Sequence, residues 1–112
     1  MRDYKEEAII FKAFCDENRL KILEMIKEGE ICACELLEKL NIVQSTLSHH
    51  MKILCDSKII VGRKEGKWTY YSFNEEGIKK AEKLIGYYTN ISSYKNTKNT
   101  AKCKCEKINS EL

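Results

Sequence analysis

The sequence predicts a small, mainly α-helical domain with one β-hairpin near its C-terminal end. Apolar residues recur at helical spacing through residues 4–54, which predicts four helices. The pattern then changes in KIIVGRKEGKWTYYSF, residues 58–73, where β-branched and aromatic residues flank a turn that contains Gly66. Helical spacing returns over residues 75–90. These observations predict four helices, a hairpin and a fifth helix.

Length and composition favour one soluble domain. A chain of 112 residues buries only a modest core, and its 43% hydrophobic content with 33% charge is typical of a folded, soluble protein. The start, MRDYKEEA, is charged where a signal peptide would be apolar, so we expect a cytoplasmic protein with no membrane partner. The net charge of +3 is compatible with a nucleic-acid partner without requiring one.

The first two helices have distinct patterns. Over residues 4–14 apolar side chains occupy more than one face, so this helix needs more than one packing neighbour. Asp16 is placed to cap the second helix, and Gly29 to end it. The residues expected to face the core from the second helix are Leu20, Leu23 and Ile26.

The next two helices are short and closely spaced. One is expected over 33–40, and the stretch LNIV separates it from a second helix that begins at QSTLSHHMKIL. The inward residues of the pair are expected to be Leu36, Leu37, Leu40, Leu47, Met51 and Leu54. The final helix should bury Ile78, Ala81, Leu84, Ile85 and Tyr88 on one face. Residues 1–90 would thus form the domain, and the polar, lysine-rich residues 91–112 a flexible tail.

Two short helices joined by a tight turn and followed by a hairpin predict a winged helix-turn-helix, an architecture that places its second helix in the DNA major groove. Hydroxyl, amide, imidazole and ammonium groups on the outer face of that helix can reach bases and phosphates. The predicted DNA-binding residues of this helix are Gln44, Ser45, Thr46, Ser48, His49 and Lys52. Arg63, Lys64 and Lys67 of the hairpin should rest on the DNA backbone. The alternatives are an ordinary solvated surface, or a protein-interaction module that binds no DNA.

Other site chemistries find little support. His50 leans toward the packed side of its helix and is expected to be a half-buried structural residue. Adjacent histidines diverge by about 100° on a helix, which argues against a zinc site built on His49 and His50. The sequence contains no phosphate-binding glycine loop and no ordered catalytic triad, so we do not expect an enzyme.

The stretches NRLKILEMI, CACELLEKLNIVQSTLSHHMKIL and GKWTYYSF resemble the ArsR–SmtB family of metal-responsive winged-helix repressors. The resemblance runs from about residue 8 to residue 88. It implies a homodimer built on the first and last helices, over residues 4–14 and 75–90. It also implies a repressor that binds operator DNA, expected to be an inverted repeat, and releases it when an inducer binds.

The chain departs from the family pattern at several positions. Glu17 stands where the family often has proline, and Leu37 where arsenic-binding members often carry a third cysteine. The carboxylate and histidine ligands of zinc-sensing members are missing from residues 75–90.

Cys32 and Cys34 are the candidate inducer ligands. Soft thiolates favour As(III), Sb(III), Cd(II), Pb(II), Cu(I) and Zn(II), and the resemblance favours As(III) or Sb(III). Side chains two apart diverge on a helix but share one side of an extended chain. We therefore expect that a shared ligand requires the first turn of the helix over 33–40 to unwind, which would tilt the next helix out of the groove.

The remaining ligands are open. As(III) takes three thiolates, and Cys103 and Cys105 could supply the third, because about fifteen flexible residues would reach roughly 20 Å. These two cysteines could equally be unused. A disulfide or persulfide switch at Cys32 and Cys34, without metal, is a further alternative. Cys15 and Cys55 are expected to be small core residues.

Overall fold

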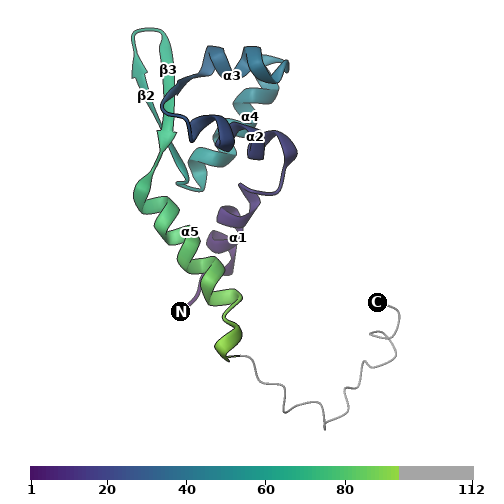
Figure 1. Ribbon diagram of the computed structural model, residues 1–112, viewed down its shortest axis with the longest axis vertical. Helices are drawn as coiled ribbons and strands as arrows, with labels where there is room; N and C mark the ends of the chain where they lie inside the picture. Colours follow the sequence, from purple (N-terminus) through teal and green to yellow (C-terminus); the bar gives the residue numbers. More distant parts are fainter. Residues whose placement is uncertain (94–112) are drawn as a thin grey trace, which may run out of the picture.

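The computed structural model describes residues 1–93, and Figure 1 shows how their helices and strands are arranged. The elements are α1 (Tyr4–Lys12), α2 (Glu17–Ile26), β1 (Ile31–Cys32), α3 (Ala33–Leu40), α4 (Gln44–Asp56), β2 (Ile60–Glu65), β3 (Trp68–Phe73) and α5 (Glu75–Tyr88). A short 3-10 helix, Ile91–Ser93, follows α5. This order confirms the predicted winged helix-turn-helix. The rest of the predicted tail lies outside the described residues.

The residues predicted to begin a helix or to form a turn have the expected backbone roles at Asp16, Gly29 and Gly66. The carboxylate of Asp16 accepts hydrogen bonds from the backbone N–H groups of Asn18 and Arg19, which caps α2. Gly29 has a φ of 134°, which only glycine adopts without strain. Gly66 has a φ of 65°, which glycine adopts readily.

Helices α1 and α5 each end two residues before the predicted C-terminal end. The first helix ends at Lys12 rather than at residue 14, because the next backbone N–H groups bond to carbonyls three residues back and tighten the chain into a turn. The last helix ends at Tyr88 rather than at residue 90. Hydrophobic spacing continues beyond both ends, so the pattern alone does not mark them.

The sheet has one strand more than predicted. Strands β2 and β3 form the predicted hairpin, in register from Ile60 opposite Phe73 to Glu65 opposite Trp68. The additional strand β1 pairs with the other edge of β3, so the strand order is β1-β3-β2. Two residues are too few to show an alternating pattern, and only the tertiary position of β3 makes them a strand.

The core lies where α2, α3 and α4 pack against the base of the hairpin. The largest fully buried side chains are those of Ile22, Leu36, Leu54, Ile59 and Ile60. The prediction that Leu20 faces this core is wrong, since it is 51% exposed. The preceding residue, Arg19, is buried instead, because its guanidinium donates a hydrogen bond to the carbonyl of Ala13 and contacts the imidazole of His50.

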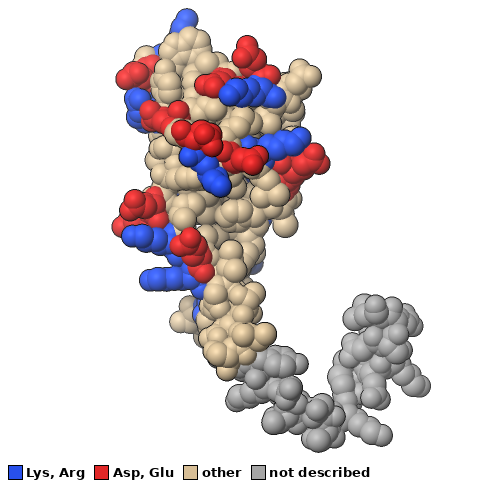
Figure 2. Space-filling model, in the orientation of Figure 1, with Lys and Arg blue, Asp and Glu red and all other residues tan. Residues whose placement is uncertain are grey.

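Helices α1 and α5 lie side by side below the other helices in the view of Figure 1, and α1 also contacts α4. Ala81 and Leu84 are buried as predicted, whereas Ile85 and Tyr88 remain 45% and 46% exposed. Figure 2 shows mixed acidic and basic side chains over the upper part of the visible face and a largely uncharged surface toward the end of α5. Within residues 1–93, no helix is both long and apolar enough to cross a membrane.

Candidate functional site

The helix-turn-helix consists of α3 and α4, joined by a turn in which Asn41 has a φ of 54°. Asn41 closes α3 in the left-handed conformation that asparagine tolerates better than most residues. The helix α4 then buries Leu47, Met51 and Leu54, as predicted, and keeps its opposite face in solvent. The exposed predicted DNA-binding residues are Gln44, Ser45, Ser48, His49 and Lys52, and Thr46 is half-buried.

The basic residues of the wing differ in their surroundings. The guanidinium of Arg63 donates two hydrogen bonds to Glu30, at 2.8 and 2.9 Å, and a third to Glu65. The hydrogen bonds to Glu30 raise the pKa of Arg63 and lower that of Glu30. Among the described residues, neither Lys64 nor Lys67 forms an ion pair, so their charges are available to a phosphate.

The buried residue His50 connects α4 to the first two helices. Its Nδ1 lies 2.9 Å from Nη1 of Arg19. The Nη2 and Nε groups of the same guanidinium donate hydrogen bonds to the carbonyls of Lys12 and Ala13 at the end of α1. Burial lowers the pKa of His50, against a smaller opposite effect of the Asp16 carboxylate. His50 is 6% exposed, more deeply buried than predicted, and has the predicted structural role.

Cys32 and Cys34 lie together without any unwinding of α3. Cys32 has extended backbone, with φ −79° and ψ 144°, because it belongs to β1 and is the N-cap of α3. Its sulfur lies 2.7 Å from that of Cys34 and accepts a hydrogen bond from the Cys34 backbone N–H. The expectation that the first turn must unwind is therefore wrong: the helix begins at Ala33, as predicted, and Cys32 lies outside it in extended backbone, which already brings the two sulfurs together.

The contact between the sulfurs separates their acidities. The hydrogen bond from Cys34 lowers the pKa of Cys32, and the same contact raises the pKa of Cys34. Of the two thiols, Cys32 is therefore the one that ionises more readily.

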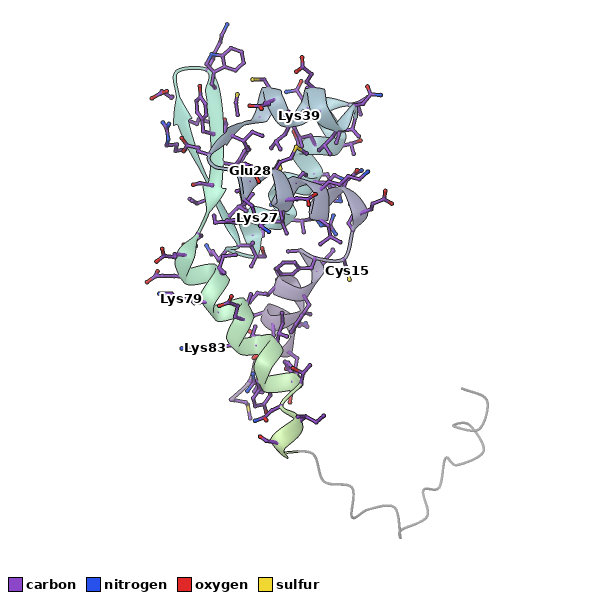
Figure 3. All side chains as sticks on the ribbon, in the orientation of Figure 1. Cys15, Lys27, Glu28, Lys39, Lys79 and Lys83 are labelled. Atoms are coloured by element: carbon purple, nitrogen blue, oxygen red, sulfur yellow. The ribbon has the colours of Figure 1, made fainter. Side chains whose placement is uncertain are left out.

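The other cysteines do not join this pair in the described structure. Cys15 is exposed in the turn between α1 and α2 (Figure 3), so its prediction as a core residue is wrong. Cys55 is partly buried against the core, and its burial raises its pKa. Cys103 and Cys105 lie outside the described residues. Within residues 1–93, no group of three or more His, Cys, Asp or Glu side chains is placed to hold a metal ion.

A cleft joins several predicted site residues. It has a volume of about 320 Å³ and lies between α3, α4 and β3. Cys34, Gln44, Ser48 and Lys67 all line it, which brings the thiol pair, the recognition helix and the wing to one place. Sequence reasoning missed Trp68, which is 46% exposed on this cleft. An aromatic residue next to the lysine-rich turn was the available signal for it.

Comparisons with known proteins agree with this geometry. Residues 16–60 match the family described as "Bacterial regulatory protein, arsR family". The chain is 41% identical over 86 residues to an HTH-type transcriptional regulator of Methanocaldococcus jannaschii, covering 76% of this chain and 97% of the relative. It is 46% identical over 71 residues to an arsenical resistance operon repressor of Staphylococcus aureus, covering 63% and 68% respectively.

A solved structure supports the fold. It is the homodimeric winged helix-turn-helix domain of a possible ArsR-family regulator from Mycobacterium bovis, with a TM-score of 0.63, 21% identity, and coverage of 81% of this chain and 84% of that one. Together with the family match and the two relatives, the order of helices and strands shows that this chain belongs to the ArsR family of transcriptional regulators, which are not enzymes.

Proposed function

We propose that this protein is a metalloid-responsive repressor that binds an inverted-repeat operator as a homodimer and releases it when As(III) or Sb(III) binds cysteine thiolates. The observation that carries this proposal is the contact between the sulfurs of Cys32 and Cys34 at the start of the helix-turn-helix. Similarity to an arsenical resistance operon repressor supports the choice of inducer. Cd(II), Pb(II) and Zn(II) are the alternative inducers.

The DNA interface follows from exposure and charge. Ser48 and His49 project from the face of α4 opposite its buried side chains and are placed to meet base edges. Gln44 and Ser45 stand at the N-terminus of α4, where free backbone N–H groups favour a phosphate. Lys64 and Lys67 would contact the DNA backbone from the wing, and Lys52 from α4, although Lys52 shares its charge with Asp56 at 3.3 Å. Thr46 and Arg63 complete the proposed interface.

The dimer would form through α1 and α5. Tyr4, Ile9, Ile85, Tyr87 and Tyr88 are each between 44% and 68% exposed, and together they give these two helices an apolar surface that the single chain leaves in water. A two-fold axis through this surface would carry the two recognition helices to half-sites about one helical turn of DNA apart. The homodimeric state of the similar M. bovis domain supports this arrangement.

Release would begin at the thiol pair. An arsenic atom bonded to both sulfurs would replace the hydrogen bond between them and shift the Cys32 sulfur, which accepts the capping hydrogen bond of α3. Cys32 pairs with Tyr70 of β3, and α3 packs against α4, so a displacement there reaches both the wing and the recognition helix. Cys103 and Cys105 would supply the third thiolate of inorganic arsenic, from the same chain or its partner.

The DNA interface can be tested with a duplex selected from a random library. We expect Ser48→Ala and His49→Ala each to weaken specific binding by about 1–3 kcal/mol, the usual range for a base contact. Lys67→Ala should weaken binding to all duplexes alike and lower the salt slope by about one unit. Glu24→Ala, an exposed change on α2, serves as the control. Unchanged affinity for both Ser48→Ala and His49→Ala would show that α4 does not read the DNA.

A thiol-redox repressor is the second candidate function. The 2.7 Å sulfur contact and the lowered pKa of Cys32 favour it, because peroxide can oxidise the two neighbouring thiols to a disulfide with release of two waters, and a sulfane-sulfur donor could instead transfer a sulfur atom to form a persulfide. Peroxide should then release DNA from the reduced protein without any metalloid. Release by arsenite under strictly reducing conditions, with no release by peroxide, would favour the metalloid function.

A further inference from the structure

Arg63 joins the wing to the segment that leads into the thiol pair. Its Nε and Nη2 groups donate hydrogen bonds to the two carboxylate oxygens of Glu30, at 2.8 and 2.9 Å. This two-bond arrangement fixes the relative position of an arginine and a carboxylate more closely than a single hydrogen bond does. Within residues 1–93, it is the one ion pair between the hairpin, residues 60–73, and another segment. Since Glu30 is two residues before Cys32, the wing is attached next to the proposed inducer site.

The side chains of this contact lie along one row of the three-stranded sheet. Tyr70 of β3 is opposite Cys32 of β1 on one side and opposite Arg63 of β2 on the other. Residues directly opposite each other in a sheet share a face, which places these three side chains together. The guanidinium carbon of Arg63 lies 5.0 Å from the centre of the Tyr70 ring, within the range of a cation–π contact. Arg63 therefore crosses the middle strand and connects β2 to Glu30, the residue before β1.

Strand β2 has little packing of its own. It buries only its first residue, Ile60, and the rest of the strand is exposed. Strand β1 pairs with β3 at only two positions and is not a neighbour of β2 in the sheet. A displacement of β1 therefore reaches β2 through the pair of Arg63 with Glu30 as well as through the backbone of β3. Two attachments on different strands resist the rotation of one strand past another, so the wing moves with β1.

We propose that Arg63 is a positioning residue that couples the thiol pair to the wing through its two hydrogen bonds to Glu30. This inference rests on the proposed release by a ligand of the thiols, and it identifies the contact that carries the displacement to the wing. When an inducer shifts Cys32, Glu30 shifts with it and draws the lysines of the wing away from the DNA backbone. Arg63 uses three of its five N–H groups within the protein, two on Glu30 and one on Glu65, so the other two remain for a phosphate.

The alternative role of Arg63 is a phosphate contact alone, and the two roles predict opposite changes in release. Loss of a phosphate contact weakens DNA binding, so less arsenite is needed to release the duplex. Loss of the coupling contact leaves the DNA-bound conformation indifferent to the thiol pair, so more arsenite is needed. The arsenite concentration that releases half of the protein therefore distinguishes the two roles.

Glu30→Gln tests the coupling while it keeps Arg63, and Glu65→Gln is its matched control. Both variants remove one negative charge next to Arg63, but only Glu30 lies outside the hairpin. We expect the two variants to bind the selected duplex within twofold of each other, and to bind arsenite in the absence of DNA within twofold of the wild type. Half-release of Glu30→Gln should need about three- to tenfold more arsenite than that of Glu65→Gln, the range expected for a residue that transmits coupling. Equal concentrations for the two variants would overturn the proposal.

Arg63→Lys provides a second variant. Lysine keeps the positive charge for a phosphate and lacks the planar group that binds both carboxylate oxygens. Arg63→Lys should also need more arsenite for release. Combined with Glu30→Gln, it should have no more effect than Glu30→Gln alone, because both changes remove the same contact. A larger effect in the combined variant would show that the two residues act separately.

Amide hydrogen exchange tests the contact without arsenite or DNA. The thiols of the full reduced chain are capped with iodoacetamide, each sulfur displacing iodide, and exchange over residues 61–65 is followed by NMR. Capping should speed this exchange severalfold in the wild type, because it displaces β1 and weakens the attachment of β2. In Glu30→Gln the exchange should be fast from the start and change little on capping. The variant Cys32→Ser with Cys34→Ser, capped in the same way, accounts for the other four cysteines.

The outcomes separate this contact from the proposed function. If arsenite releases the wild type and Glu30→Gln at the same concentration, the coupling role of Arg63 fails and the repressor function stands. If arsenite does not release the wild type, the proposed function fails, and hydrogen exchange alone decides the coupling. An equal effect of capping on the wild type and on Glu30→Gln would overturn it.

Discussion

Replacing Arg19 by alanine tests the contact network that holds the recognition helix against α1 and α2. The Arg19 side chain is buried, and its guanidinium donates to the carbonyls of Ala13 and Lys12 at 3.3 and 3.0 Å and meets Nδ1 of His50 at 2.9 Å. The bond to Ala13 and the contact with His50 are buried, and the bond to Lys12 is only partly so.

The magnitude follows from these contacts. Hydrogen bonds to charged groups contribute about 1.5–3 kcal/mol each, but removing the guanidinium also removes the cost of burying its charge. We therefore expect Arg19→Ala to lower the free energy of unfolding by about 2–4 kcal/mol. The exposed pair of Lys21 with Glu17, at 3.3 Å, provides a control, because Lys21→Ala should cost only about 0.3–0.5 kcal/mol.

Urea unfolding followed by circular dichroism measures both changes. In a double-mutant cycle, Arg19→Ala and His50→Ala should be coupled by more than 0.5 kcal/mol, the usual range for residues that share a hydrogen bond. A loss below about 1 kcal/mol for Arg19→Ala, or additivity with His50→Ala, would refute the idea that this network holds α4 in place.

Three further predictions concern pH, packing and assembly. Because burial lowers the pKa of His50, the unfolded chain binds its proton first; stability should be fully present above pH 6.5 and decline below it, and His50→Gln should flatten this slope in urea titrations at several pH values. Gly77→Ala should lower stability by about 2–4 kcal/mol, since an added Cβ would lie 1.7 Å from the carbonyl oxygen of Lys58, whereas Gly86→Ala, in open space, should be neutral or stabilising by thermal unfolding. Sedimentation should show a dimer at micromolar concentration, and Ile9→Asp should make it monomeric; a monomeric wild-type chain would contradict the proposed interface.

Much of the fold is predictable because local signals agree with tertiary packing. Asp16, Gly29 and Gly66 mark helix and turn boundaries through backbone chemistry that needs no distant partner. The face of α4 that carries Leu47 and Met51 follows from helical spacing alone. These features depend on residues close together in the sequence, so they can be predicted without knowing the tertiary structure.

The sequence-based predictions fail where contacts between residues far apart in the chain determine the local structure. β1 becomes a strand only because β3 lies beside it, and this pairing gives Cys32 the extended backbone that brings its sulfur to Cys34. Arg19 displaces Leu20 from the interior because His50 and the end of α1 supply its partners. The cleft with Trp68 likewise depends on how the hairpin folds over α3 and α4, which residue spacing does not reveal.

Titration of arsenite into the complex of protein and selected duplex, followed by fluorescence anisotropy, tests the proposed inducer site most directly. The double variant Cys32→Ser and Cys34→Ser should bind the duplex like the wild type, because neither sulfur lies on the exposed face of α4. A full switch requires roughly 10⁴-fold tighter inducer binding to the DNA-free state, and loss of the two thiolates should abolish that preference. We predict that arsenite releases the wild-type protein and leaves the variant on the duplex. Release of the variant at wild-type arsenite concentrations would contradict the account and place the inducer site elsewhere.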